Sequence, residues 1–360
     1  MASNTDGRSS NSFSLWRIIF TAVIMIFHFV GGTQFYSIYP NIKYHWYIAV
    51  EFFFVLSGYL LMLHIEKNPA ETAPAYGLSR VRRLYPEYIV AFLIMAGIKA
   101  CNSGLNILKV IIPNWMEALM LQSIWTNIFP YVNNPAWYVS ALLIMSFLIY
   151  YLLKEHRNLY LQFIGPLGVI GAMSYMYRQY GGLENFYHTE GLLLNTALLR
   201  AFTGLTLGVY VYLASEGLRK NYKSSGKGFK VCVSLLQILI FAGCLGFAML
   251  NEDQNYDFLF LALMAAGLLL ASVDEGLGRL SGLWVIKQLD RFSYAMYLSH
   301  FAAIFVMSLL FDTWNVWAWW YLPVYYLITL LLGILYSLIA GGLTGLACKC
   351  KNKLSSPKAE

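Results

Sequence analysis

The sequence predicts an all-α protein, a polytopic bundle of about ten transmembrane helices with its N- and C-termini in the cytoplasm. The first observation is composition: hydrophobic residues make up 59% and charged residues 12% of the 360 residues. A soluble domain carries about 25% charged residues, and the mean hydropathy here is +0.56. The second observation is the length of the apolar stretches, and the third is the alternating charge of the segments between them.

Ten apolar stretches are long enough to cross a bilayer, which takes about 20 helical residues. The third is short, and Pro86 is expected to begin or kink it. The last is long enough to tilt or to break at Gly341–Gly342, and 107–125 can add a re-entrant or interfacial segment. The ten predicted spans are 14–31, 45–64, 87–101, 135–153, 159–177, 191–213, 229–250, 256–273, 293–311 and 318–347.

Basic residues follow every second span, whereas the alternate connections are acidic, as in 251–257. The positive-inside rule therefore places both termini in the cytoplasm, which agrees with an even number of spans. We interpret the basic residues as topology signals and expect no nucleic-acid partner, because they do not interleave with aromatic residues on a soluble domain. The basic clusters are Arg80, Arg82 and Arg83; Lys154 and Arg157; Arg219, Lys220, Lys223, Lys227 and Lys230; Arg279, Lys287 and Arg291; and Lys349, Lys351, Lys353 and Lys358.

The predicted organisation is one transmembrane domain over 14–347, between a polar cytoplasmic tail over 1–13 and a basic one over 348–360. No cleavable signal peptide is visible, so the first span is expected to be retained. The five cysteines lack metal-ligand spacing, and we expect no metal site. These features predict a multi-pass protein surrounded by lipid, and no feature indicates its oligomeric state.

Arg17 and His28 lie in one otherwise apolar stretch. Eleven residues are roughly three helical turns plus 20°, so both side chains project from one face, about 16 Å apart along the axis. An ionisable side chain at the bilayer centre costs at least ~2.5 kcal/mol. The pair therefore indicates that a polar substrate or group is handled inside the membrane domain.

Three further candidates are ionisable residues within predicted spans. Glu51 is expected at the depth of His28, where a carboxylate would orient the imidazole for general-base catalysis. The alternative is a structural ion pair that joins two helices. Arg200 and His300 lie in the sixth and ninth spans, and each is either functional or a hydrogen-bond donor between helices.

Arg80 and Arg83 precede Pro86 and are three residues apart, so on a helix they share a face. Two guanidinium groups on one face can hold a phosphate between them. A plain topology anchor explains the same arginines equally simply.

Five segments together resemble the acyltransferase-3 family of integral-membrane acyltransferases. The first is an arginine, ten intervening residues and a histidine. The others are an acidic residue followed by Phe-Phe-Val-Leu-Ser-Gly-aromatic, an Arg-x-x-Arg motif ending in proline, a Pro-x-Trp-x-x-Ser block and a late Ser-Tyr-x-x-Tyr-Leu-x-His. They correspond here to Arg17 with His28, Glu51–Tyr59, Arg80–Pro86, Pro135–Ser140 and Ser293–His300.

The resemblance implies an O-acyltransferase that moves an acyl group, expected to be acetyl, from acyl-CoA to a hydroxyl of a cell-surface or exported glycan or lipid-linked saccharide. Arg80 and Arg83 would bind the donor phosphates, and Arg17 would neutralise them or polarise the thioester. His28, oriented by Glu51, would be the general base. Trp137, Tyr138, His300 and Arg200 are candidate substrate-binding residues, Arg200 by its depth alone. The expected location is the plasma membrane, here a bacterial inner membrane.

The alternative function is a multi-span transporter or flippase for a polar or glycolipid substrate. Transporters also require polar residues on inward-facing helix surfaces. However, the sequence has no inverted repeat between its halves and no paired broken spans at corresponding positions.

Overall fold

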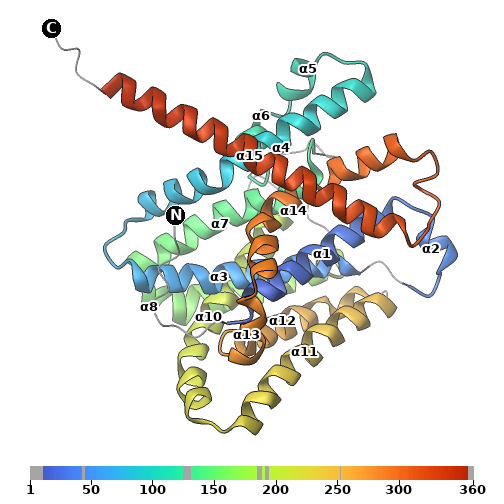
Figure 1. The fold of residues 1–360 in the computed structure, drawn as a ribbon. Coiled ribbons are helices and arrows are strands. Elements are labelled where there is room, and N and C mark those ends of the chain that lie inside the picture. Colours follow the sequence, from blue (N-terminus) through green and yellow to red (C-terminus); the bar gives the residue numbers. More distant parts are fainter. Residues whose placement is uncertain are drawn as a thin grey trace.

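Ten long helices form the framework of the protein, and the predicted helical bundle is confirmed (Figure 1). The structure, a computed structural model, describes residues 11–42, 45–124, 131–184, 189–190, 194–251 and 253–355. Within them, ten helical segments are long and apolar enough to cross a membrane. The long helices are α1 (Phe13–Gly31), α3 (Ala49–Lys67), α4 (Ala73–Ser103), α7 (Trp137–Glu155), α9 (Gly165–Tyr180), α10 (Thr196–Ser224), α11 (Lys227–Leu250), α12 (Asp257–Ala271), α14 (Trp284–Leu310) and α15 (Tyr321–Ser355).

Short elements connect the long helices. The predicted interfacial segment over 107–125 contains two short helices, which lie beside α4 in Figure 1. The short elements are helical segments of three to seven residues and one two-stranded antiparallel ladder. They are α2 (Phe35–Ile38), η1 (Trp46–Ile48), α5 (Ile107–Ile111), α6 (Trp115–Ala118), η2 (Asn134–Ala136), α8 (Arg157–Leu159), η3 (Tyr160–Ile164), β1 (Thr189–Glu190), β2 (Leu194–Asn195), η4 (Gln254–Tyr256) and α13 (Glu275–Ser281).

One predicted helix boundary is wrong, and one of the two alternatives for the last helix is excluded. Pro86 does not begin the third span, because α4 already starts at Ala73 and continues through the proline. Its first half carries the three arginines, and these polar residues kept it out of the apolar stretch that predicted the span. The last helix, α15, is unbroken at Gly341 and Gly342. Glycine and proline are tolerated inside membrane helices because neighbouring elements satisfy the backbone.

The closest helix crossing joins α3 to α10. A Cβ atom on Gly58 would lie 1.9 Å from the carbonyl oxygen of Leu205, and one on Gly208 would lie 2.0 Å from that of Val55. No side chain fits at either position, so the two backbones are in direct contact. Small residues are the usual means by which membrane helices approach this closely. This crossing fixes the position of every side chain on the adjacent turns of α3 and α10.

Helices α1 and α14 run side by side in the same direction. Arg17 near the start of α1 pairs with Asp290 near the start of α14, and His28 lies against His300 further along both helices. The start of α1 is also anchored to α11, because Ser12 and Trp16 both donate hydrogen bonds of 2.9 Å to the Gln237 side chain. These contacts hold α1 in a fixed register against its neighbours.

Candidate active site

A cavity of about 560 Å³ opens between the first halves of α1, α4 and α14 and the helices α3, α7 and α15. Binding pockets for small molecules span about 300–1,000 Å³. The outer part of this cavity is polar and its inner part is aromatic and aliphatic. Five arginines line it, namely Arg17, Arg80, Arg82, Arg83 and Arg291, together with one carboxylate, Glu87. The cavity is therefore suited to an anionic molecule with an apolar arm.

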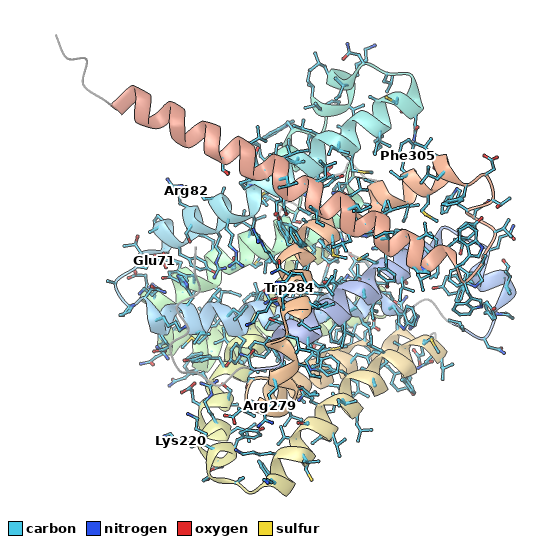
Figure 2. All side chains as sticks on the ribbon, viewed as in Figure 1. Glu71, Arg82, Lys220, Arg279, Trp284 and Phe305 are labelled. Carbon is cyan, nitrogen blue, oxygen red and sulfur yellow. The ribbon has the colours of Figure 1, made fainter. Side chains whose placement is uncertain are left out.

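The arginines of α4 are available to a ligand. Arg82 and Arg83 are exposed and Arg80 is half-buried, and Figure 2 shows Arg82 on the first half of α4. None of the three forms an ion pair with a described residue, although the Arg80 guanidinium lies 4.9 Å from the ring centre of Tyr76. Glu87 instead accepts a hydrogen bond of 2.5 Å from Ser337. Unpaired guanidinium groups around one hollow form a strong anion-binding surface.

Arg17 differs from these arginines, because Asp290 already neutralises it. The Asp290 carboxylate also accepts a hydrogen bond of 2.8 Å from Ser14. The side chain of Arg17 is 31% exposed and lines the cavity. It can therefore contact a ligand while its position is fixed by α14.

The inner end of the cavity lies one helical turn from two histidines. Ile24 lines the cavity, and His28 follows it by four residues, about 6 Å along α1. Tyr297 lines the cavity on α14, and His300 follows it by three residues, about 4.5 Å further. The rings of His28 and His300 have their centroids 5.1 Å apart. The cavity thus runs from the five-arginine mouth to within one helical turn of the histidine pair.

The expected pairing of Glu51 with His28 is wrong. One carboxylate oxygen of Glu51 accepts a hydrogen bond of 2.8 Å from Nε of Arg200 and lies 2.7 Å from Nη2 of the same guanidinium in an ion pair. The other oxygen has no hydrogen-bond partner in the described part of the chain. Both side chains are 1% exposed, and the rotation of α3 points Glu51 toward α10 and not toward His28.

Arg200 therefore joins α10 to α3. This agrees with the alternative prediction that Arg200 is a hydrogen-bond donor between helices. Its guanidinium also lies 4.9 Å from the ring centre of Trp137 on α7. Trp137 is only 6% exposed. One face of the ring of this candidate substrate-binding residue is thus occupied by Arg200. Tyr138, by contrast, lines the cavity, and its ring centre lies 5.8 Å from that of Tyr297.

His300 is not a donor between helices. Its Nδ1 bonds to the Tyr297 carbonyl oxygen in the same helix at 2.5 Å, and its Nε2 is buried without a partner among the described residues. Its contact with His28 was not foreseen. A signal existed, because His300 follows Asp290 by ten residues, nearly the eleven that separate Arg17 from His28.

A buried carboxylate holds the loop that packs on this part of α14. Glu117 accepts hydrogen bonds of 2.7 Å from the backbone amides of Val132 and Asn133. Asn133 in turn donates to the Leu298 carbonyl at 3.1 Å, and Tyr297 donates to the Pro135 carbonyl at 2.6 Å. Burial raises the pKa of the Glu117 carboxyl to about 7, although the two amide donors act in the opposite direction. Glu117 is a positioning group outside the spans.

The cavity and the histidine pair can now be compared with known proteins. The family model described as an acyltransferase domain, that of the acyltransferase-3 family, matches residues 10–338. The chain belongs to this family. The match includes every arginine of the cavity and both histidines. No curated protein and no solved structure matches the chain. In the described part of the acyltransferase, no group of three or more His, Cys, Asp or Glu side chains is placed to hold a metal ion.

Proposed function

We propose that this membrane acyltransferase is an O-acyltransferase that transfers an acyl group, acetyl in the first instance, from acyl-CoA to a hydroxyl of a cell-surface or exported glycan. The observation that carries the proposal is the continuous path from the five-arginine mouth to the turn below His28 and His300. A donor with phosphates at one end and a reactive thioester at the other matches that path in charge and polarity.

The donor phosphates would bind at the mouth. Arg80 and Arg83 are three residues apart on α4, and both lack a carboxylate partner among the described residues. Charge-assisted bonds from guanidinium groups to phosphate are about twice as strong as neutral hydrogen bonds. Arg17, held by Asp290, would meet the donor deeper in the cavity. The pantetheine arm would then lie along the Tyr138 and Tyr297 side chains that line the cavity.

The transfer needs one base. In the proposed step, a ring nitrogen of His28 takes the proton of the acceptor hydroxyl as its oxygen attacks the thioester carbonyl carbon. The tetrahedral intermediate collapses with cleavage of the carbon–sulfur bond. The departing thiolate takes the proton back from His28, which leaves an ester on the acceptor and free CoA. No covalent acyl-enzyme is required.

The proposed orientation places the arginine mouth in the cytoplasm, where acyl-CoA is made. Both termini would be cytoplasmic, as the positive-inside rule predicts for ten spans. The acceptor would reach the histidines from the opposite side of the membrane. The proposed location is accordingly the plasma membrane, a bacterial inner membrane in the simplest case.

The test is thiol release from acetyl-CoA by the purified protein in liposomes, together with mass spectrometry of surface glycans from cells with and without the protein. We expect His28→Ala to lower transfer by roughly 10²–10⁴-fold. The matched control is His156→Ala, because His156 is exposed and remote from the cavity. Full activity in a folded His28→Ala variant would exclude His28 as the base. Absence of any acyl-CoA binding by the wild type would favour a transporter.

A further inference from the structure

His300 has one ring nitrogen whose role the packing does not explain. Its Nδ1 lies 2.5 Å from the Tyr297 carbonyl oxygen. A carbonyl oxygen only accepts, so Nδ1 must carry the proton, and in the neutral ring Nε2 is then a bare acceptor. That Nε2 is buried and has no hydrogen-bond partner in the described part of the chain. A buried polar atom left unpaired costs about 1–3 kcal/mol.

The neighbour of this acceptor is His28. The two rings are 5.1 Å apart between centroids and tilted by 30°. This spacing is close to that of two imidazoles joined by one N–H···N hydrogen bond. Phe301 packs edge-on against both rings, at 4.9 Å from His28 and 5.1 Å from His300. Phe301 thus packs on both members of the pair, of which His300 is buried and His28 half-buried.

Among the described residues, no carboxylate forms a hydrogen bond with His28. Glu51, the residue the sequence favoured as the partner of His28, is committed to Arg200 by two short contacts. A catalytic histidine usually donates one N–H to a group that fixes its tautomer and ring orientation. His300 Nε2 is an acceptor whose own ring is already held in place by a backbone carbonyl.

We propose that His300 is the positioning residue for His28: its Nε2 accepts the N–H of His28 and leaves the second nitrogen of His28 as the acceptor for the substrate hydroxyl. This proposal rests on the proposed function. The proton of the substrate hydroxyl moves to His28 and later to the leaving thiolate. His300 gains and loses no proton in the cycle, and it stabilises the positive charge that His28 carries in between.

The test compares two substitutions that differ in one acceptor. His300→Phe keeps a planar ring and removes the acceptor, whereas His300→Gln keeps an amide oxygen near the position of Nε2. The matched control is Ser299→Ala on the same turn of α14, whose hydroxyl bonds only to the backbone carbonyls of Met296 and Thr329. All three are assayed for kcat and for the KM of acetyl-CoA in liposomes.

We expect His300→Phe to lower kcat by roughly 10–100-fold, the range typical of lost groups that orient a functional histidine. The KM of acetyl-CoA should stay within about twofold, because His300 does not touch the phosphates. His300→Gln should retain activity within about fivefold of the wild type, and Ser299→Ala should match it. A folded His300→Phe with unchanged kcat, or a His300→Gln as inactive as His300→Phe, would overturn the proposal.

A spectroscopic readout keeps the proposal testable even where a variant does not fold. Nitrogen NMR of the wild type with labelled histidine should show His28 in a single tautomer with a coupling across an N–H···N bond to His300. A tautomer mixture without that coupling would overturn the positioning role. This outcome leaves the proposed function intact, because that function fails only when the wild type shows no acyl transfer or when a folded His28→Ala retains it.

Discussion

Arg200 and the arginines of the cavity are the same residue type in opposite surroundings. Arg200 is 1% exposed, is paired with Glu51 and lies against Trp137. Arg82 and Arg83 are exposed, line a large hollow and form no ion pair with a described residue. A buried charge must be neutralised inside the protein, whereas water solvates an exposed charge, which therefore stays available to a ligand.

A structural arginine differs from a binding arginine here by its carboxylate partner, and not by its depth in the bundle. Arg200 is more deeply buried than Arg83, and its charge is already neutralised by Glu51. The cavity arginines carry positive charge that the lining does not balance, since Glu87 is the one carboxylate among the described lining residues. That excess makes the cavity, rather than the buried pair, the candidate donor site.

The largest expected effect comes from breaking the buried pair. Arg200→Met leaves the Glu51 carboxylate buried without its cation, and such changes cost about 3–5 kcal/mol. We expect poor yield and a strongly lowered melting temperature in detergent. The double variant Arg200→Met with Glu51→Gln removes both charges and should recover at least half of that loss. If Arg200→Met melts like the wild type, the pair does not support the fold.

The crossing that holds the pair should be nearly as sensitive. Gly58→Ala places a Cβ atom 1.9 Å from the Leu205 carbonyl, so α3 and α10 must separate, and overpacking of this kind costs about 1–3 kcal/mol. The matched control is Gly97→Ala, because a Cβ atom on Gly97 has no neighbour within 4 Å. Thermal melting should show a loss only for Gly58→Ala. Equal melting of the two variants would show that the crossing can relax.

The cavity arginines should affect binding and leave stability alone. We expect Arg80→Ala with Arg83→Ala to raise the KM of the acyl-CoA donor by about 100-fold or more, since hydrogen bonds to charged groups contribute about 1.5–3 kcal/mol each. The melting temperature should stay near that of the wild type. Arg157→Ala is the control, because Arg157 pairs with Glu66 away from the cavity. An unchanged donor KM would remove both residues from the site.

Glu117 should make the stability of the protein depend on pH. It is a buried carboxylate held by backbone amides and not by an arginine. Its pKa in the fold, about 7, exceeds its usual value of 4.5, so the folded state binds the proton more tightly. Stability should therefore fall as pH rises from about 4.5 to 7 and level off above 7, by at most about 1.4 kcal/mol per pH unit. Melting curves of Glu117→Gln should lack this slope. An identical slope in both proteins would assign it to another group.

The apolar pattern predicted the number of spans because a bilayer leaves the backbone few alternatives to a helix. It failed at the first half of α4, where three arginines hid a helix that continues through Pro86. The spacing of Arg80 and Arg83 pointed to two residues that line the cavity together with Arg17, whereas His28 lies one helical turn beyond the lining. The partner of Glu51 could not be predicted, since depth along a helix says nothing about which neighbour a side chain faces.

The sequence by itself determined the helical membrane architecture, the family and the candidate site residues, because hydrophobicity and short motifs are local properties of the chain. Only the tertiary structure decided that Glu51 belongs to Arg200 and that His28 meets His300. Both outcomes depend on the rotation and crossing of helices far apart in sequence, such as the glycine contact between α3 and α10. Side-chain pairing across helices is a property of packing, and packing is settled by all of the helices together.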